Sequence, residues 1–173
     1  MDQAIAQEID FVQKRRIERR AGRVEFDRRC FDRRGRCFYA LKTVYLSDTN
    51  AFGNTYFAKY FEWQGMAREA FLARHLVPDV SVLMKSGVKL ITVEASHSYK
   101  QETVVYDRVC VEVRAGAPKN ASVELLFTFR NDRTNQLIGE GRQVIAFANN
   151  KGKLIRVPEA ITENLKRFRQ LCE

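Results

Sequence analysis

In its second half, the 173-residue chain consists mostly of segments in which apolar and polar residues alternate at a period of two. This alternation is typical of strands that have one buried face and one exposed face. Turn-forming residues at 115–118 and 131–132 separate the segments, and long strands with short connections favour antiparallel pairing. We therefore predict a mostly antiparallel sheet from four strands, over 88–99, 104–114, 122–130 and 136–149.

Two segments show helical periodicity instead. The longer one covers 55–74, and its apolar residues share one helical face: Tyr60, Trp63, Ala67, Ala70 and Phe71. Pro158 opens the second helix, which runs to about Leu171. A further strand of about eight residues is predicted between Phe38 and Leu46. The order strand, long helix, four strands, helix predicts an α+β domain in which one sheet packs on one central helix.

The first 36 residues differ from the rest in charge. They hold 11 Lys and Arg against 7 Asp and Glu, a net charge of +4, in a chain whose net charge is +9. We predict a basic N-terminal extension over 1–36, with a short amphipathic helix up to about Ala21, followed by one folded domain over 37–173. A solvated tail and a docking segment for an acidic partner both fit this composition. The basic balance favours anionic partners, such as nucleic acid, acidic carrier proteins or coenzyme A phosphates, without choosing among them.

Composition also excludes several classes of protein. No run of 18 apolar residues is present, and the N-terminus lacks the pattern of a secretory signal, so we expect a cytoplasmic protein that does not span a membrane. The four cysteines form no CxxC pair and the chain has two histidines, so we predict no metal site, no cofactor and reduced thiols. His97 alternates with Ile91, Val93 and Ala95, which favours a buried core histidine over a catalytic one.

The most informative window is 48–69, where a polar loop leads into the long helix. Free N–H groups at a helix start can hold a carbonyl oxygen that acquires negative charge. Gly53 permits an unusual dihedral angle or a close approach of the backbone. Capping of the helix by Asn50 or Asn54 is the alternative reading of this loop.

Arg68 lies in an otherwise uncharged row of the same helix. It shares a stripe with Phe61, Gly65 and Leu72. A glycine inside a helix costs about 1 kcal/mol relative to alanine, which suggests that Gly65 leaves needed space beside the helix. An ion pair of Arg68 with Glu94 or Glu112 is the alternative to a functional role.

The window from Asp48 to Glu69 resembles the signature of hot-dog-fold thioesterases of the 4-hydroxybenzoyl-CoA thioesterase type. In that signature, Asp-Thr/Cys-Asp-x-x-Gly precedes an aromatic-rich segment and a helix ending in Ala-Arg. The resemblance covers about residues 37–170. It implies the hot-dog fold, in which an antiparallel sheet wraps around one long central helix.

The second acid of the family's loop, its nucleophile or general base, is Asn50 in this chain. An amide only donates and accepts hydrogen bonds. Thr-Asn-x-x-Gly-Asn together with Trp-Gln-Gly-x-x-Arg-Glu is similar to the subgroup that releases polyketide chains in enediyne biosynthesis. The first loop acid, Asp48, resembles a structural residue of the family, although it remains a possible base.

The resemblance implies hydrolysis of an acyl or β-ketoacyl thioester on acyl carrier protein or coenzyme A. Asn50 would bind the thioester carbonyl or the attacking water, the backbone N–H of Phe57 would complete the oxyanion site, and Arg68 would stabilise negative charge. We assign substrate binding to the following residues: Gly53, Asn54 and Tyr60. Tyr60 and Trp63 are also interpreted as core residues.

The resemblance further implies a homodimer or homotetramer with the acyl site at the subunit interface. Such pairing would give hydrogen-bond partners to the backbone N–H and C=O groups of an exposed sheet edge. Because Asn50 replaces an acid, a non-catalytic hot-dog module that binds acyl-CoA or acyl carrier protein is the alternative. A nucleic-acid-binding protein that uses the basic extension is less favoured.

Overall fold

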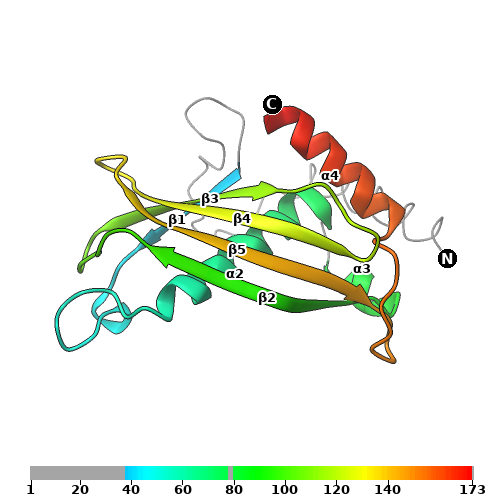
Figure 1. Ribbon diagram of the computed structural model, residues 1–173, viewed down its shortest axis with the longest axis horizontal. Coiled ribbons are helices and arrows are strands. Elements are labelled where there is room, and N and C mark those ends of the chain that lie inside the picture. Colours follow the sequence, from blue (N-terminus) through cyan, green and yellow to red (C-terminus); the bar gives the residue numbers. More distant parts are fainter. Residues whose placement is uncertain (1–37, 78–79, 173) are drawn as a thin grey trace, which may run out of the picture.

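The computed structural model describes residues 38–77 and 80–172, and they form an α+β domain with one five-stranded sheet (Figure 1). All neighbouring strands are antiparallel, in the order β1-β3-β4-β5-β2. The strands are β1 (Phe38–Thr43), β2 (Lys89–Tyr99), β3 (Arg108–Ala115), β4 (Ser122–Asn131) and β5 (Leu137–Ala148). The predicted N-terminal helix and the boundary after residue 36 lie outside the described residues.

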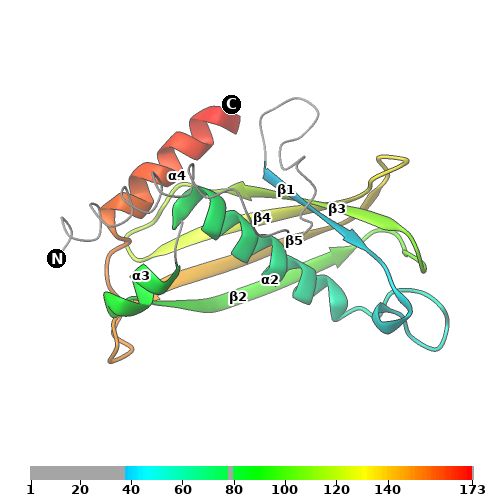
Figure 2. The same ribbon diagram turned by 180° about the vertical axis from the view of Figure 1, so that it is seen from behind.

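One long helix, α2 (Lys59–Phe71), lies along one face of the sheet (Figure 2) and continues as a π-helical turn over Leu72–Leu76. Its apolar face is buried as predicted, with Tyr60, Trp63, Ala67 and Phe71 at most 3% exposed. The helix begins four residues later than predicted. The N–H groups of Thr55 and Tyr56 bond to the carbonyls of Thr103 and Asp48, which holds these residues in the loop.

The C-terminal helix α4 (Glu159–Cys172) follows Pro158, as predicted. It buries Ile161, Leu165 and Phe168, and the Phe168 ring meets Phe71 at 4.8 Å. Two short helical segments were not predicted: a 3-10 turn over Leu46–Asp48, and α3 (Val80–Lys85). Six residues are too few to show helical periodicity in a sequence. Within the described part of the chain, no helix has the length and apolar character needed to cross a membrane.

The alternation in the central strands matches their burial. Val109, Val111 and Val113 of β3 are at most 1% exposed, and the alternate residues Val123, Leu125, Phe127 and Phe129 of β4 are at most 3% exposed. β3 begins at Arg108 rather than 104. Residues 104–107 form a turn closed by the N–H of Val104, which donates to Asp107 Oδ2 at 2.9 Å.

The antiparallel sheet and the central helix α2 on one of its faces confirm the predicted hot-dog arrangement.

The edge strand β2 departs from the predicted alternation. A bulge between Thr92 and Glu94 shifts its register against β5. Consequently Thr92 contacts α2 through Arg68, whereas Ile91 is 37% exposed. The prediction that Ile91 shares the inner face with His97 was wrong, because a bulge inserts one residue and inverts the parity of what precedes it. Val93 is 57% exposed at this edge.

Candidate active site

Asp48 anchors the loop that leads into α2. Its carboxylate accepts the N–H of Tyr45 and pairs with Lys42 Nζ, each at 2.9 Å, and its carbonyl accepts the N–H of Tyr56 at 2.8 Å. Burial opposes ionisation, but the hydrogen bond and charge of Lys42 and the Tyr45 N–H outweigh it and hold the pKa of Asp48 below its usual range. A carboxylate with a lowered pKa and these partners is a weak base, so Asp48 serves the loop's structure.

Asn50 forms a compact turn with the residues that follow it. Its Oδ1 accepts the N–H of Phe52 at 2.8 Å, and its carbonyl accepts the N–H of Gly53 at 3.0 Å. Gly53 has φ +84°, which an L side chain rarely adopts, and a Cβ there would meet no atom within 4 Å. Gly53 therefore serves the turn through its dihedral angle. Among the described residues, none accepts a hydrogen bond from Nδ2 of Asn50.

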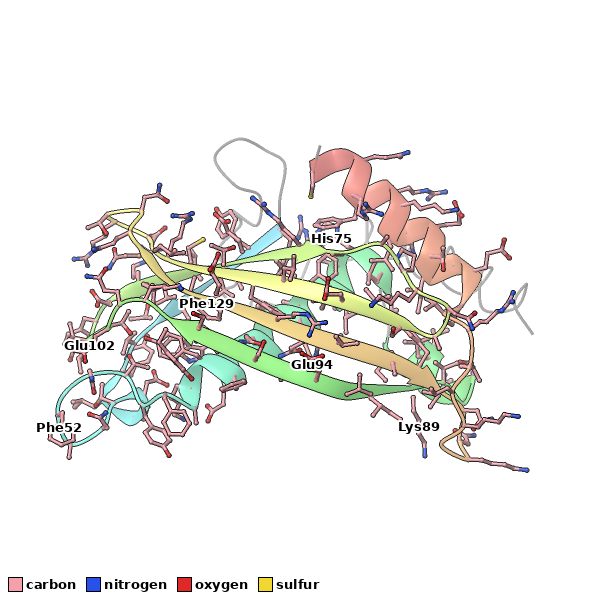
Figure 3. The ribbon with its side chains drawn as sticks, in the orientation of Figure 1. Phe52, His75, Lys89, Glu94, Glu102 and Phe129 are labelled. Atoms are coloured by element: carbon pink, nitrogen blue, oxygen red, sulfur yellow. The ribbon has the colours of Figure 1, made fainter. Side chains whose placement is uncertain are left out.

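A hollow of about 660 Å³ lies between this loop and the segment that follows β2. Four of the predicted site residues line it, namely Asn50, Asn54, Phe57 and Tyr60, whereas Gly53 does not. The remaining lining residues are Ala51, Phe52, Thr55, Tyr56, Tyr99, Lys100, Gln101 and Glu102. Figure 3 shows the labelled Phe52 and Glu102 at the same end of the molecule. Residues from two segments about 50 positions apart thus form one cavity.

The walls of the cavity are rich in aromatic side chains. Phe52 is 93% exposed, and the Tyr56 and Phe57 rings contact each other at 4.7 Å. The Tyr99 hydroxyl donates to the Phe57 carbonyl at 3.0 Å, which ties the end of β2 to the start of α2. Asn54 donates through Nδ2 to Glu102 Oε1 at 2.9 Å, while its Oδ1 is buried without a partner in the described structure.

The hydroxyl of Tyr60, a residue that lines the cavity, is already engaged in a hydrogen bond. It lies 3.0 Å from Thr103 Oγ1, which in turn lies 2.6 Å from Thr55 Oγ1. Burial raises the pKa of Tyr60, so the phenol stays neutral. Sequence reasoning missed Thr55, Thr103 and Tyr99, because no local pattern marks contacts that form only when the loop before α2 meets the end of β2 and the loop that follows it.

The backbone N–H of Phe57 lies just before the first turn of α2. Ala58 is the N-cap, and its side chain makes no capping hydrogen bond. No backbone carbonyl of the described residues accepts the Phe57 N–H. An unpaired donor at the positive end of a helix can bind an oxygen that carries negative charge.

Arg68 lies eight residues beyond Tyr60 on α2, about 12 Å along the axis at 1.5 Å per residue. Its Nη1 donates to Thr92 Oγ1 at 2.8 Å and to Gln143 Oε1 at 3.3 Å, and Nη2 lies 3.8 Å from Glu69. The alternative ion pair with Glu94 is not formed, since Glu94 pairs with Arg142. Arg68 does not line the cavity of its own chain.

Gly65 keeps the helix surface beside this row open, because a Cβ there would meet no atom within 4 Å. The space that the sequence suggested is therefore present.

His97 packs against Tyr60 and Phe129, with ring centroids 4.8 Å apart in each case, as the core interpretation predicts. Burial lowers its pKa to about 4. No group of three or more metal-binding side chains occurs in residues 38–77 and 80–172.

Comparisons with known proteins agree with this architecture. The crystal structure of the dynemicin thioesterase, solved in a study of polyene binding, is 28% identical with a TM-score of 0.69, over 76% of this chain and 96% of that one. A 1,4-dihydroxy-2-naphthoyl-CoA thioesterase from Synechocystis shares 18% identity and a TM-score of 0.69, over 75% and 95%. A Staphylococcus aureus protein whose structure was solved in complex with CoA is 14% identical with a TM-score of 0.75, over 80% of this chain and 87% of that one.

Comparison with curated proteins finds no match. The model of the thioesterase-like superfamily matches residues 44–165, which include the loop, the central helix and all strands except β1. The family and the dynemicin thioesterase together support thioester hydrolysis as the general reaction. The chain belongs to the thioesterase-like superfamily and has the hot-dog fold of its thioesterases.

Proposed function

We propose that the protein hydrolyses acyl or β-ketoacyl thioesters carried by an acyl carrier protein or by coenzyme A, and that its substrate is a polyketide chain. The observation that carries this proposal is the cavity at the start of α2. It brings Asn50, whose Nδ2 is free within the described structure, to the same cavity as Phe57, whose N–H has no backbone acceptor there. Two such donors suit a thioester oxygen that becomes negatively charged.

The chemistry follows from the absence of an acid at position 50. Water attacks the thioester carbonyl carbon, the carbon–sulfur bond breaks, and the leaving sulfur takes up a proton from the attacking water. The products are a carboxylic acid and a free thiol. Asn50 and Phe57 stabilise the oxyanion, and Arg68 stabilises further negative charge at the carbonyl or on a β-keto or carboxylate group.

The aromatic lining supports a long, flat acyl chain as substrate. Four aromatic residues line the cavity and are 45–93% exposed to solvent, namely Phe52, Tyr56, Phe57 and Tyr99. Aromatic rings bury much area and stack on conjugated chains. The crystal structures of the dynemicin thioesterase revealed effects of polyene binding on that protein. Its likeness to this chain supports an unsaturated polyketide as the substrate.

We also propose that the active site is shared between two subunits. Thr92, the contact of Arg68, lies seven residues from Tyr99 at the cavity, about 23 Å along β2. Antiparallel pairing of two β2 edges about Glu94 would place Thr92 of one chain opposite Ser96 of the second. The distance to the second chain's Tyr99 along the strand is then about 10 Å.

The exposed edge itself supports this pairing. The apolar Ile91 and Val93 are 37% and 57% exposed on a strand with one free side. Free strand edges are templates for pairing with another chain. A homodimer is therefore the proposed minimal unit, and a tetramer of two such dimers is the extension of it.

Thiol release from acyl-CoA and acyl-carrier-protein thioesters tests the reaction. No release from either class, with retained binding, would instead indicate a binding module. Co-expression of Asn50→Ala and Arg68→Met chains tests the shared site. If each site takes Asn50 from one chain and Arg68 from the other, heterodimers contain one intact site, and the mixture recovers up to about one quarter of wild-type turnover. If both residues come from one chain, no activity is recovered.

A further inference from the structure

Three inward-facing positions of β5 lack an apolar side chain. They are Gly139, Gly141 and Gln143, in a strand that otherwise supplies Ile145 and Phe147 to the core. A Cβ at Gly141 would lie 2.3 Å from Gln64 Nε2, and a Cβ at Gly139 would lie 2.6 Å from His97 Nε2. The two glycines therefore leave the space that these polar side chains occupy between α2 and the sheet.

The polar side chains in this space form one continuous row. Arg68 Nη1 donates to Gln143 Oε1 at 3.3 Å, and Gln143 Nε2 donates to Gln64 Oε1 at 3.2 Å. Gln64 Nε2 then lies 3.1 Å from His97 Nδ1 and 3.1 Å from the Ser96 carbonyl. Gln64 is 0% exposed and Gln143 is 4% exposed, so the two amides meet each other in the dry core.

The chemistry of arginine sets the direction of every bond in the row. A guanidinium has donors and no acceptor, so the Gln143 group facing it must be the carbonyl oxygen. The other end of Gln143 is then a donor, which requires the oxygen of Gln64 and leaves the NH₂ of Gln64 facing His97. His97 Nδ1 must accept, and the neutral ring carries its proton on Nε2, which is buried without a hydrogen-bond partner in the described structure. Burial lowers the pKa of His97 to about 4, which agrees with a neutral ring.

An apolar side chain of similar volume would fill either glutamine position without this need for matched partners. Buried amides are costly when a partner is missing, and the two amides find all their partners in one arrangement only. The row ends on Arg68 at one side and on the tightly packed His97 at the other. What it provides is a fixed position for the Arg68 guanidinium, whose other neutral partner is Thr92.

We propose that Gln143 and Gln64 are positioning residues that hold Arg68 for the reaction. This inference rests on the proposed function, because it takes Arg68 to act on the thioester. Gln143 orients the guanidinium, and Gln64 orients Gln143 by anchoring it to His97 and to the β2 backbone. Misplacing a reacting or stabilising group by about 1 Å can lower a rate by about 100-fold.

The tautomer of His97 tests the row in the wild-type protein without any assay of activity. The ¹⁵N chemical shifts of the two imidazoles at pH 7, assigned with a His97→Gln variant, distinguish the two neutral forms. We expect His97 protonated on Nε2. A proton on Nδ1 would overturn the proposal, because the amide directions could not then follow from Arg68.

Kinetics test the positioning. Gln143→Met keeps the volume and removes both hydrogen bonds, and we expect kcat to fall about 10- to 100-fold with KM changed less. Gln143→Glu keeps an acceptor for Arg68 and should retain more of kcat. The matched control is Gln136→Met, at an exposed glutamine just before β5, which should behave as wild type.

A double variant identifies the residue through which Gln143 acts. Arg68→Met/Gln143→Met should be no slower than Arg68→Met, because the second change removes support from a group that is already gone. Losses that multiply would overturn the proposal. If the wild-type protein hydrolyses no thioester, the proposed function fails, while the tautomer of His97 still decides whether the row exists. If Gln143→Met does not fold, Gln143→Glu and the tautomer decide it.

Discussion

Asn50 offers the sharpest test, because its two amide atoms have separate tasks. Oδ1 is committed to the turn, where it accepts the Phe52 N–H at 2.8 Å. Nδ2 has no acceptor among the described residues, and Asn50 lines the cavity. If catalysis uses Asn50 as a donor, then removing the NH₂ group is what matters, and the substitutions Asn50→Ala and Asn50→Asp separate the two tasks.

Asn50→Ala removes both atoms. The lost turn contact is an exposed, neutral hydrogen bond, so the free energy of unfolding should fall by about 0.5–1.5 kcal/mol. Loss of one oxyanion donor should lower kcat by about 100- to 1,000-fold, equivalent to about 2.7–4 kcal/mol of transition-state stabilisation.

Asn50→Asp keeps an oxygen for the Phe52 N–H and replaces the donor by a second carboxylate oxygen. Stability should stay within about 0.5 kcal/mol of wild type, because the turn is retained. Activity should fall at least as far as in the alanine variant, since a carboxylate repels the negative charge that develops on the thioester oxygen. Chemical denaturation and steady-state thiol release measure the two effects. An aspartate variant as active as wild type would refute the donor role and show that a carboxylate serves at this place.

Four further predictions follow from other parts of the molecule. Arg68→Met keeps the aliphatic stem, and kcat/KM should fall more on β-keto or carboxylate-bearing thioesters than on simple acyl chains; equal losses would place Arg68 at the thioester itself. Burial lowers the pKa of His75 and His97 from 6.5 to about 4. Below pH 6.5 these two histidines therefore bind more protons in the unfolded chain than in the folded protein. Stability should therefore be fully present above pH 6.5 and decline as the pH falls toward 4, and denaturation midpoints across that range would reveal a contrary trend. Val93→Lys puts a charge on the exposed edge of β2 and should give a folded monomer by sedimentation, whereas an intact dimer would exclude β2 pairing. Deleting residues 1–36 should leave hydrolysis of small and of carrier-bound thioesters unchanged; a KM raised only for the carrier-bound substrate would identify a docking segment.

Much of the fold could be predicted from the sequence because its periodicity reports burial directly. Alternating residues of β3 and β4 enter the core, and the face of α2 around Trp63 and Phe71 is buried as its spacing predicts. The bulge in β2 could not be predicted, because it is visible only in the register against β5. Nor could the threonine pair of Thr55 and Thr103, which depends on two loops meeting.

The sequence signature identified candidate site residues, but it did not show where they lie relative to one another. The loop signature led to Asn50, Asn54, Phe57 and Tyr60, and one cavity does contain them. The same signature led to Arg68, which lies two helical turns away and contacts Thr92 and Gln143 instead. A sequence motif names residues without stating which chain provides each of them. In the proposed dimer, the exposed, partly apolar edge of β2 would bring these two groups together across two subunits, and the shared site would then explain both the placement of Arg68 and the unpaired edge.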